Sequence, residues 1–382
     1  MRVLVVTHEA SRSGAPRVAV LVARTLVDQG HSVRVLSRAP GPLLADFAAA
    51  APTSVEFLYR VRRRLRSIRV ARLIAWFVDT LLVTVTLLWR RPDLVYVNST
   101  AAAVYLRPAG WLVRRRVLHV HESGSLAARF LGAARAPRWP NGVALVACSP
   151  SVQADLAALT GQSVDAIAML PSVPDESEVV RLAAERPDHT YSADELVVGT
   201  CGTVEHRKGA DLWVEVARKV RLELADRPIR FVWVGDIVQP VSQSVQNLDV
   251  EFIGPSPNPY AHMRRFDVAT LPSRDDPFPL VVLEAMLVGT PVVAFAVGSV
   301  AAQVGDAGIV VAPEDTDAFA RSVVRLLSDD NERERLSTAA HARVMDHYST
   351  RVFAAALANL IHTVSVSRMQ IRFQTPAPEG NE

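Results

Sequence analysis

Short apolar runs alternate with amphipathic stretches along most of this 382-residue chain. The first unit has an apolar run at 3–6, a glycine-containing loop at 11–16, an amphipathic stretch at 18–29 and a second apolar run at 31–36. Gly30, between the last two, is a typical helix stop signal. This order predicts a β-strand, a loop, an α-helix and a second strand parallel to the first.

Units of the same kind recur in both halves of the chain. In the first half, runs at 93–99, 116–122 and 143–149 predict strands that end in polar residues. A second series begins with a strand at 196–202, and its other predicted elements are strands at 231–235, 250–254, 268–271, 291–294 and 309–311 and helices at 213–224, 282–288, 315–328 and 331–348. Strands that alternate with helices indicate a parallel sheet covered on both faces, so we expect an α/β fold.

The stretch at 171–190 interrupts this alternation. It is rich in proline and acidic residues and shows little periodicity, which is typical of an interdomain linker. We therefore expect two Rossmann-like domains, at 1–170 and 191–349, because a chain of this length is sufficient for two α/β cores. The last residues, 369–382, are rich in proline, glycine and acid and are predicted to form a loose tail.

The stretch from Ala71 to Trp89 is strongly apolar, but Asp79 and several threonines interrupt it. None of its apolar runs reaches the roughly 18 residues that a membrane span requires. A run of arginines from Arg60 to Arg72 leads into it, and a basic, apolar segment is typical of a helix lying on an anionic membrane surface. The region from Arg60 to Trp89 is thus a candidate membrane-docking segment. The alternative is a helix that packs on the sheet and exposes its arginines to solvent.

The net charge of +3 conceals an unequal distribution. Residues 1–170 contain 22 Arg and no Lys against 9 acidic residues, a net charge of +13. The remainder contains 18 Arg and 2 Lys against 30 acidic residues, a net charge of −10. A basic first half favours an anionic partner, such as a membrane surface or an acidic acceptor, and attraction between the domains is an alternative explanation. We expect no nucleic-acid partner.

The two cysteines, Cys148 and Cys201, lie far apart in apolar runs and are interpreted as buried thiols. The apolar run that opens the chain is too short for a secretory signal. We therefore expect a cytoplasmic protein, peripheral on the inner face of the cell membrane if the docking hypothesis holds.

The strongest chemical motif is the segment 272–294, in which an acidic loop runs into a predicted helix. The free backbone N–H groups of the first helical turn, near Leu280 and Val281, can bind a diphosphate. Glu284 lies one turn further on, where a carboxylate can accept hydrogen bonds from both hydroxyls of a ribose. Asp276 precedes the turn and can reach a sugar hydroxyl.

A second motif, residues 202–209, follows the first strand of the second domain. Its basic pair could bind a phosphate, because Arg207 has a planar fork of hydrogen-bond donors and Lys208 supplies a point charge. These charges would stabilise a departing nucleoside diphosphate. A basic pair before a helix is common, however, and on its own is weak support for a site.

The segment 272–294 resembles the signature of the family-4 retaining glycosyltransferases of the GT-B fold (glycosyl transferases group 1). That signature is an acidic residue, seven further residues and a glutamate, here Asp276 and Glu284. The resemblance implies two Rossmann-like domains with parallel sheets facing each other across a cleft, and a donor held by the second domain. It assigns donor contacts to four consecutive residues between the two acids, Phe278, Pro279, Leu280 and Val281.

The segment 202–209 resembles the glycine-rich turn of the same family, which implies donor contacts from Gly202 and Thr203. The family often has arginine where this chain has Thr203, and Arg207 could compensate for it. The family's first acid is usually glutamate, where this chain has the shorter Asp276.

The resemblance extends to other parts of the chain. It implies that Gly14 lets the backbone approach the diphosphate and that the turn at Ile253 and Gly254 reads the nucleobase. A closing helix at 350–368 is implied to cross back to the first domain. His121 is implied to face the donor sugar, and a merely hydrogen-bonded histidine at a strand end is the alternative.

Strand alternation places His119 on the same side as His121. A His-x-His pair could bind a metal ion, but no third ligand is apparent, so we disfavour a metal site.

The function implied by the resemblance is retaining transfer of a sugar from a nucleotide-diphosphate sugar to an acceptor hydroxyl, on a glycan or a lipid-linked acceptor at the membrane surface. No metal or other cofactor is expected. The implied catalytic residues are His121, Arg207, Lys208 and Asp276, and no nucleophile for a double displacement is singled out. The alternatives are a sugar-nucleotide-binding relative with little activity, a partner subunit, or a sugar-nucleotide epimerase with the same fold.

Overall fold

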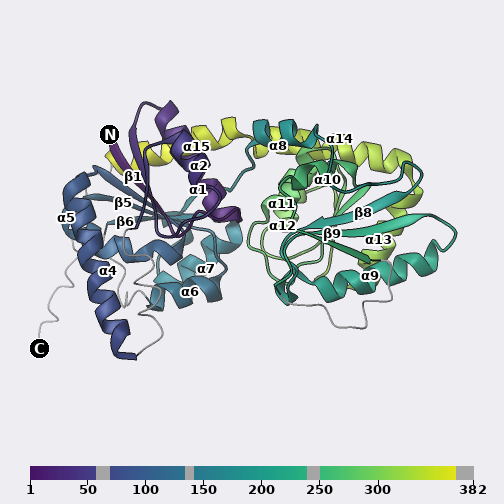
Figure 1. Cartoon of the computed structure of the whole chain (residues 1–382), viewed down its shortest axis with the longest axis horizontal. Helices are drawn as coiled ribbons and strands as arrows, with labels where there is room; N and C mark the ends of the chain where they lie inside the picture. Colours follow the sequence, from purple (N-terminus) through teal and green to yellow (C-terminus); the bar gives the residue numbers. More distant parts are fainter. Residues whose placement is uncertain (57–68, 134–141, 239–249, 367–382) are drawn as a thin grey trace, which may run out of the picture.

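The computed structural model describes residues 1–56, 69–133, 142–238 and 250–366. Two lobes lie side by side, and each is built around one sheet with helices on its faces (Figure 1). The predicted α/β fold with two Rossmann-like domains is confirmed.

The first sheet has seven strands in the order β3-β2-β1-β4-β5-β6-β7, and every pair of neighbours is parallel. The strands are β1 (Arg2–Thr7), β2 (Ser32–Ser37), β3 (Thr53–Val55), β4 (Leu94–Asn98), β5 (Arg115–Val120), β6 (Val143–Ala147) and β7 (Ala168–Met169). The strand order reverses between β1 and β4, and ligands of open α/β sheets bind beyond the carboxyl ends at such a point.

The helices of the first domain are α1 (Gly14–Asp28), α2 (Leu44–Ala50), α4 (Arg69–Arg90), α5 (Leu106–Leu112), α6 (Gly124–Ala133) and α7 (Pro150–Thr160). Helix α1 buries Val18, Val22 and Leu26, which lie four residues apart on one face. Helix α4 forms over the apolar part of the candidate docking segment, and residues 60–68 of that segment lie outside the described residues. Within the described residues, no helix is both long enough and apolar enough to cross a membrane.

The second sheet has six parallel strands in the order β10-β9-β8-β11-β12-β13, so its order reverses between β8 and β11. The strands are β8 (Leu196–Cys201), β9 (Ile229–Val234), β10 (Val250–Gly254), β11 (Val268–Leu271), β12 (Val292–Phe295) and β13 (Ile309–Val311). The helices are α9 (Ala210–Glu223), α10 (Pro259–Arg265), α11 (Leu280–Leu287), α12 (Val300–Val304), α13 (Thr316–Ser328) and α14 (Asp330–His347). Both sequence motifs of the second domain begin at its reversal point, because 202–209 follows β8 and 272–279 follows β11.

Two buried tryptophans connect the core of the second domain to the first of these motifs. The rings of Trp213 and Trp233 meet edge to face, with 5.4 Å between centroids. Trp213 Nε1 donates a hydrogen bond to Thr270 Oγ1 at 3.0 Å, and Trp233 Nε1 donates one to the Gly202 carbonyl at 2.7 Å. The aromatic core therefore fixes the backbone at the end of β8.

The segment predicted as an irregular linker, 171–190, contains a helix, α8 (Glu176–Ala183). Asp175 caps it by accepting a hydrogen bond from the Glu178 N–H, and Val179 and Ala183 are buried one turn apart. The sequence pattern missed α8 because a helix of two turns has too few apolar positions to show a period. Helix α8 packs against α10 and α11.

The last described helix, α15 (Thr350–Val366), runs back along the first domain (Figure 1). It buries Phe353, Leu357, Leu360 and Ile361 in a cluster made mainly of residues from β1, β2 and α1. Residues 367–368 of the segment predicted as a crossing helix lie outside the described residues. The predicted tail at 369–382 lies outside the described residues.

Gly209, in the loop that follows β8, provides a test of how closely that loop packs on the loop that follows β11. Gly209 has a φ of +73°, and a Cβ added there would lie 1.9 Å from the Pro272 carbonyl oxygen. Gly254 has a φ of +77° with nothing within 4 Å of such a Cβ. We expect Gly254→Ala to lose about 1–2 kcal/mol from left-handed strain alone. Gly209→Ala should lose clearly more, as a lower melting temperature, and equal losses would contradict the close packing of the two loops.

Candidate functional site

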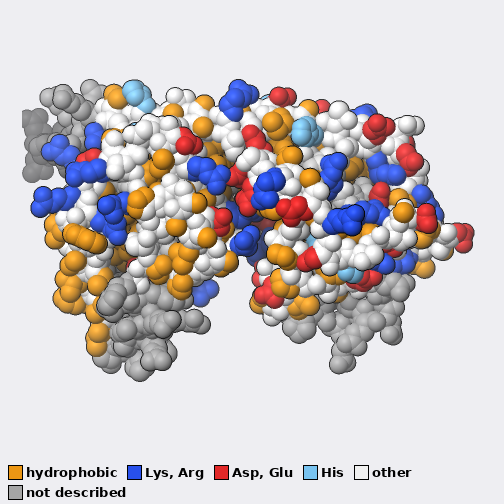
Figure 2. All heavy atoms as spheres, turned by 45° about the horizontal axis from the view of Figure 1, so that its top comes forward, with side chains coloured by type: hydrophobic (Ala, Val, Ile, Leu, Met, Phe, Trp, Pro, Cys, Tyr) orange, Lys and Arg blue, Asp and Glu red, His pale blue; other side chains and the backbone are white. Residues whose placement is uncertain are grey.

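A cleft of about 720 Å³ lies between the two domains. Figure 2 shows basic and acidic side chains close together where the lobes meet. The cleft is lined by twelve of the residues predicted for the site: Gly14, His121, Gly202, Thr203, Arg207, Lys208, Asp276, Phe278, Pro279, Leu280, Val281 and Glu284. Residues that the sequence separates by up to 270 positions are therefore brought to one place.

The wall formed by the second domain carries the basic pair. Lys208 Nζ lies 2.5 Å from Asp276 Oδ2, and both side chains are largely buried. Arg207 donates to the Asp275 carbonyl and to Glu205 Oε1, both at 2.8 Å, but its side chain remains 45% exposed. Arg207 is thus the more accessible cation, while Lys208 joins the two motifs.

Arg274 fixes the loop that carries Asp276. Its guanidinium donates to both carboxylate oxygens of Asp211 in α9, at 2.7 and 2.8 Å. These hydrogen bonds lower the pKa of Asp211, so the pair stays charged. The Arg274 N–H also donates to the Arg207 carbonyl at 2.9 Å. The loops after β8 and β11 therefore form one rigid unit.

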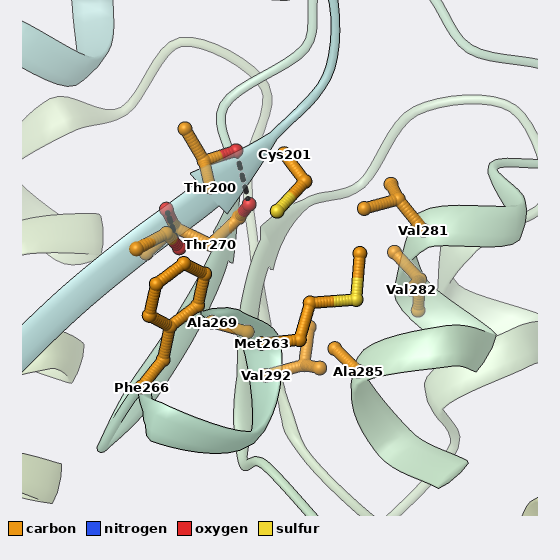
Figure 3. Close-up of a pocket in the computed structure, with 11 residues that line it drawn as sticks. Thr200, Cys201, Met263, Phe266, Ala269, Thr270, Val281, Val282, Ala285 and Val292 are labelled. Carbon is orange, nitrogen blue, oxygen red and sulfur yellow. Dashed lines mark hydrogen bonds between the residues drawn. The ribbon is translucent and has the colours of Figure 1, made fainter. Parts of the chain in front are cut away.

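Helix α11 is seated on the sheet by apolar contacts. In Figure 3, Val281, Val282 and Ala285 of α11 face Cys201 and Met263 around a small cavity. Thr200 Oγ1 donates to the Thr270 carbonyl at 2.8 Å and holds β8 against β11 beside it. The first turn of α11 therefore presents its unpaired N–H groups to the cleft from a fixed position.

Glu284 meets a residue of the other domain. The carboxylate, only 3% exposed, lies 2.5 Å from Nη2 of Arg17 in α1. The same nitrogen donates to Tyr260 Oη at 2.5 Å. Burial opposes the charge of Arg17, but the attraction of Glu284 and Tyr260 outweighs it, so the pKa of Arg17 lies above its usual value. The sequence reading missed Arg17, although its spacing of three from Gly14 places it on the same side of α1.

His121 is held in one tautomer at the end of β5. Asn98 Nδ2 donates to the Ala15 carbonyl at 2.8 Å, which turns Asn98 Oδ1 toward His121 Nε2, 3.1 Å away. Nε2 therefore carries the proton and donates it, and Nδ1 accepts from Ser172 Oγ at 3.2 Å. Burial, with smaller contributions from His119 and His8, holds the pKa of His121 well below its usual value. The imidazole at the cleft is neutral near pH 7.

His119 lies behind His121 on the same side of β5, with 4.1 Å between the ring centroids. Its Nε2 donates to the Leu170 carbonyl at 3.0 Å, and its Nδ1 accepts from Tyr96 Oη at 2.9 Å. Burial lowers the pKa of His119 to about 3. Within the described part of the chain, no three His, Cys, Asp or Glu side chains are grouped as a metal site would need.

The starts of helices α1 and α11 face each other across the cleft. A Cβ added to Gly14 would lie 3.7 Å from Leu280 Cδ1, in ordinary contact. Ser123 Oγ donates to Asp275 Oδ2 at 3.2 Å from the first domain to the second. Two positive helix ends thus converge on the same space, which suits an anion.

Ile253 and Gly254 are not part of the cleft wall. They are the last residues of β10, and the Gly254 carbonyl accepts a hydrogen bond from the Gly235 N–H at 2.8 Å. The residues that follow, Pro255 and Ser256, do line the cleft. The nucleobase role of Ile253 and Gly254 stays a prediction, and the residues of this turn that line the cleft are the next two in the sequence.

Two family models match the chain. The model described as Glycosyl transferases group 1 matches residues 195–329, and that described as Glycosyltransferase Family 4 matches residues 12–172. Together they cover most of both domains.

Curated relatives match over part of their length. The D-inositol 3-phosphate glycosyltransferase of Corynebacterium urealyticum is 32% identical over 152 residues, covering 36% of this chain and 36% of that protein. The glycogen synthase of Mycobacterium tuberculosis is 28% identical over 231 residues, covering 56% of this chain and 53% of that protein. The chain therefore spans about a third to a half of the length of these two relatives.

Solved structures match nearly the whole chain. The structure of Anabaena Alr3699/HepE in complex with UDP-glucose has a TM-score of 0.71 at 18% identity, covering 95% of this chain and 100% of that chain. A likeness at this identity shows that the two proteins share a fold.

We expect the Arg17 contact to hold the domains together. Arg17→Ala removes an ion pair and a hydrogen bond that cross the cleft, so the mean separation of the domains should grow. Small-angle X-ray scattering would record a larger radius of gyration than for the unchanged protein. Arg34→Ala, at an exposed position of β2, is the control. An unchanged radius for Arg17→Ala would contradict a holding role for the contact.

His119 should make the protein sensitive to acid. The unfolded imidazole takes up a proton below its reference pKa of 6.5, whereas the buried one does so only near 3. The free energy of unfolding should therefore fall as the pH drops through this window, by about 1.4 kcal/mol per pH unit from this group. In His119→Gln, the melting temperature should fall less steeply with acid than in the unchanged protein. Parallel slopes would show that folding does not lower the pKa of His119.

Proposed function

The chain belongs to the family-4 (group 1) glycosyltransferases of the GT-B fold, and we propose that it moves a sugar from a nucleotide-diphosphate sugar to an acceptor hydroxyl with retention of configuration. The observation that carries this proposal is the convergence of Arg207, Lys208, Glu284 and the start of α11 on one cleft.

Each part of the donor has a matching group in the proposed site. The diphosphate would lie between the first turn of α11 and the basic pair, where N–H groups and cations neutralise it. Glu284 would accept hydrogen bonds from the ribose hydroxyls, and its buried side chain lines the cleft, which supports that role. The base would lie near Pro255 and Ser256.

The sugar would lie between Asp276 and the wall formed by the first domain. His121 is neutral and donates its Nε2–H to Asn98, so it is not a proton donor to the leaving group. Its proposed role is to hold the sugar in place by contact with the imidazole ring. Asp276 is held by Lys208 and could accept a hydrogen bond from a sugar hydroxyl. Neither residue is placed as an activated nucleophile.

The proposed reaction is driven by positioning and electrostatics. As the glycosidic bond to the diphosphate breaks, negative charge grows on the phosphate oxygen, and Arg207, Lys208 and the start of α11 stabilise it. The acceptor hydroxyl attacks from the same face and gives its proton to that oxygen, so atoms and charges balance and no metal ion is required. Holding donor and acceptor together supplies much of the rate.

The relatives support this proposal. One solved neighbour was crystallised with UDP and with UDP-glucose, which makes a uridine nucleotide the first donor to test. The acceptor is proposed to be a glycan or a lipid-linked molecule, bound on the side of the first domain. We propose a cytoplasmic location for the enzyme.

The two lysines of the chain offer a matched test. Lys208→Ala removes a cation from the leaving group and should lower kcat about 100- to 1,000-fold, as loss of one such stabilising group does. Lys219→Ala removes a cation on α9 that pairs with Glu215 and Asp317 and should leave kcat unchanged. Release of nucleotide from UDP-glucose, with and without acceptor, measures both. Equal rates for the two variants would contradict the site.

Glu284→Gln tests the nucleotide contact and the reaction class together. The amide has the shape of the carboxylate but accepts weaker hydrogen bonds from the ribose hydroxyls. The KM for the donor should therefore rise at least about tenfold. Proton NMR of the product should show the donor's anomeric configuration. An inverted product would overturn the retaining mechanism, a changed sugar without acceptor would indicate an epimerase, and nucleotide binding without turnover would indicate a non-catalytic relative.

A further inference from the structure

Helix α4 is apolar on two opposite faces. Val83 and Leu87 are buried against the first domain. The other face carries Ile74, Phe77, Leu81, Val85 and Leu88, which are three or four residues apart and at least half exposed. Because an α-helix turns every 3.6 residues, these positions form one stripe about 20 Å long, directly opposite the buried face. Among the described residues of the first domain, none buries this stripe.

Helix α5 extends the apolar surface. It packs beside α4, and its end presents Trp111, which is 80% exposed, and Leu112. Trp89, at the end of α4, is 78% exposed. Figure 2 shows hydrophobic side chains gathered on the left of the molecule, where Figure 1 places α4 and α5, on the side away from the second domain. We call the exposed residues of the α4 stripe with Trp89, Trp111 and Leu112 the α4–α5 face.

Arginines border this face. Arg91 follows Trp89 and α4, Arg107 lies one turn before Trp111 on α5, and Arg114 follows Leu112 by two residues. None of the three makes an ion pair with another described residue, and Arg91 and Arg114 are exposed. The arginines belong to the basic half of the chain, with a net charge of +13 over residues 1–170.

We propose that the α4–α5 face docks the enzyme on an anionic lipid bilayer. Aliphatic and phenylalanine side chains would enter the acyl boundary, tryptophans favour the interface, and the bordering arginines would meet lipid phosphates. A second copy of the chain fits less well, because a symmetric contact would bring the same arginines together. The inference goes beyond the proposed function and does not depend on it.

Docking in this way leaves the cleft accessible. The α4–α5 face lies at the outer end of the first domain, and the cleft lies at its other side, toward the second domain (Figure 1). The enzyme would thus rest on the membrane by its acceptor-side domain, while the second domain remains free to bind its nucleotide from solution.

The test is co-sedimentation of the full chain with phosphatidylcholine vesicles, with and without phosphatidylglycerol. We expect binding to the anionic vesicles, weakened by salt, and little to the neutral ones. Leu81→Glu should reduce binding at least about tenfold, because an apolar contact is lost and a like charge is added. The matched control is Leu222→Glu, on α9 of the second domain, where the leucine is 71% exposed. It should bind as the unchanged protein does.

Three further variants separate the contributions of the arginines and the tryptophans. Arg107→Gln and Arg114→Gln should each weaken anionic binding about fivefold. Trp89→Phe with Trp111→Phe should remove a vesicle-induced blue shift of the tryptophan emission. Equal binding to both vesicle types, no binding, or equal loss in Leu81→Glu and Leu222→Glu would overturn the proposal. So would a dimer in sedimentation velocity that Leu81→Glu dissociates.

A nucleotide-binding control separates the docking proposal from the proposed glycosyltransferase function. Thermal shift with UDP-glucose should be the same for all surface variants and the unchanged protein, which shows that the second domain is intact. If no protein responds to the nucleotide but the vesicle results hold, the proposed function fails and the docking proposal stands.

Discussion

The close approach of two loops at the reversal point of the second sheet is the constraint on which the site depends. The loop after β8 and the loop after β11 meet at Gly209, where a side chain would strike the Pro272 carbonyl, and at the ion pair of Lys208 with Asp276. The first loop carries the basic pair, and the second leads into α11. Because neither loop can move without the other, the cations and the helix start keep a fixed separation, as binding a diphosphate requires.

The unequal charge of the two halves is explained in part by ion pairs of the first domain with later parts of the chain. Arg17 pairs with Glu284, and Arg24 of the same helix pairs with Asp175 at the start of α8. Attraction between a basic and an acidic domain is therefore part of the explanation for the charge distribution. It does not account for Arg107 and Arg114, which lie at the other end of the first domain beside an exposed apolar face. The proposed docking on an anionic membrane would explain the positive charge of these two arginines.

The alternation of apolar runs predicted all six strands of the second sheet and the five longer strands of the first, since buried parallel strands are apolar throughout. It missed β3 and β7, which at three and two residues are too short to show a pattern. The motif residues could be found because they lie in loops and helix starts that follow the carboxyl ends of strands, where topology alone brings them together. Arg17 could not be found in this way. Its contact with Glu284 joins positions in different domains and depends on how the domains are arranged, which no local pattern encodes. Ile253 and Gly254 end β10, whereas Pro255 and Ser256, which follow them, line the cleft. A sequence pattern does not fix which residue of such a turn faces a cleft, because element ends are the least regular part of a strand.

The Arg17 contact also makes the domain arrangement and the nucleotide interdependent. If the ribose takes Glu284 as proposed, it competes with the guanidinium for the same buried carboxylate. The two effects are thermodynamically linked. The ion pair of Arg17 with Glu284 lowers the affinity for the nucleotide by a certain factor, and the bound nucleotide weakens the ion pair by the same factor. The charge of Arg17 need not be lost in the exchange, because its helix begins at Gly14, opposite the start of α11, where a diphosphate would lie. An arginine released from Glu284 can turn toward that phosphate, so the same side chain can hold the empty cleft and bind the filled one.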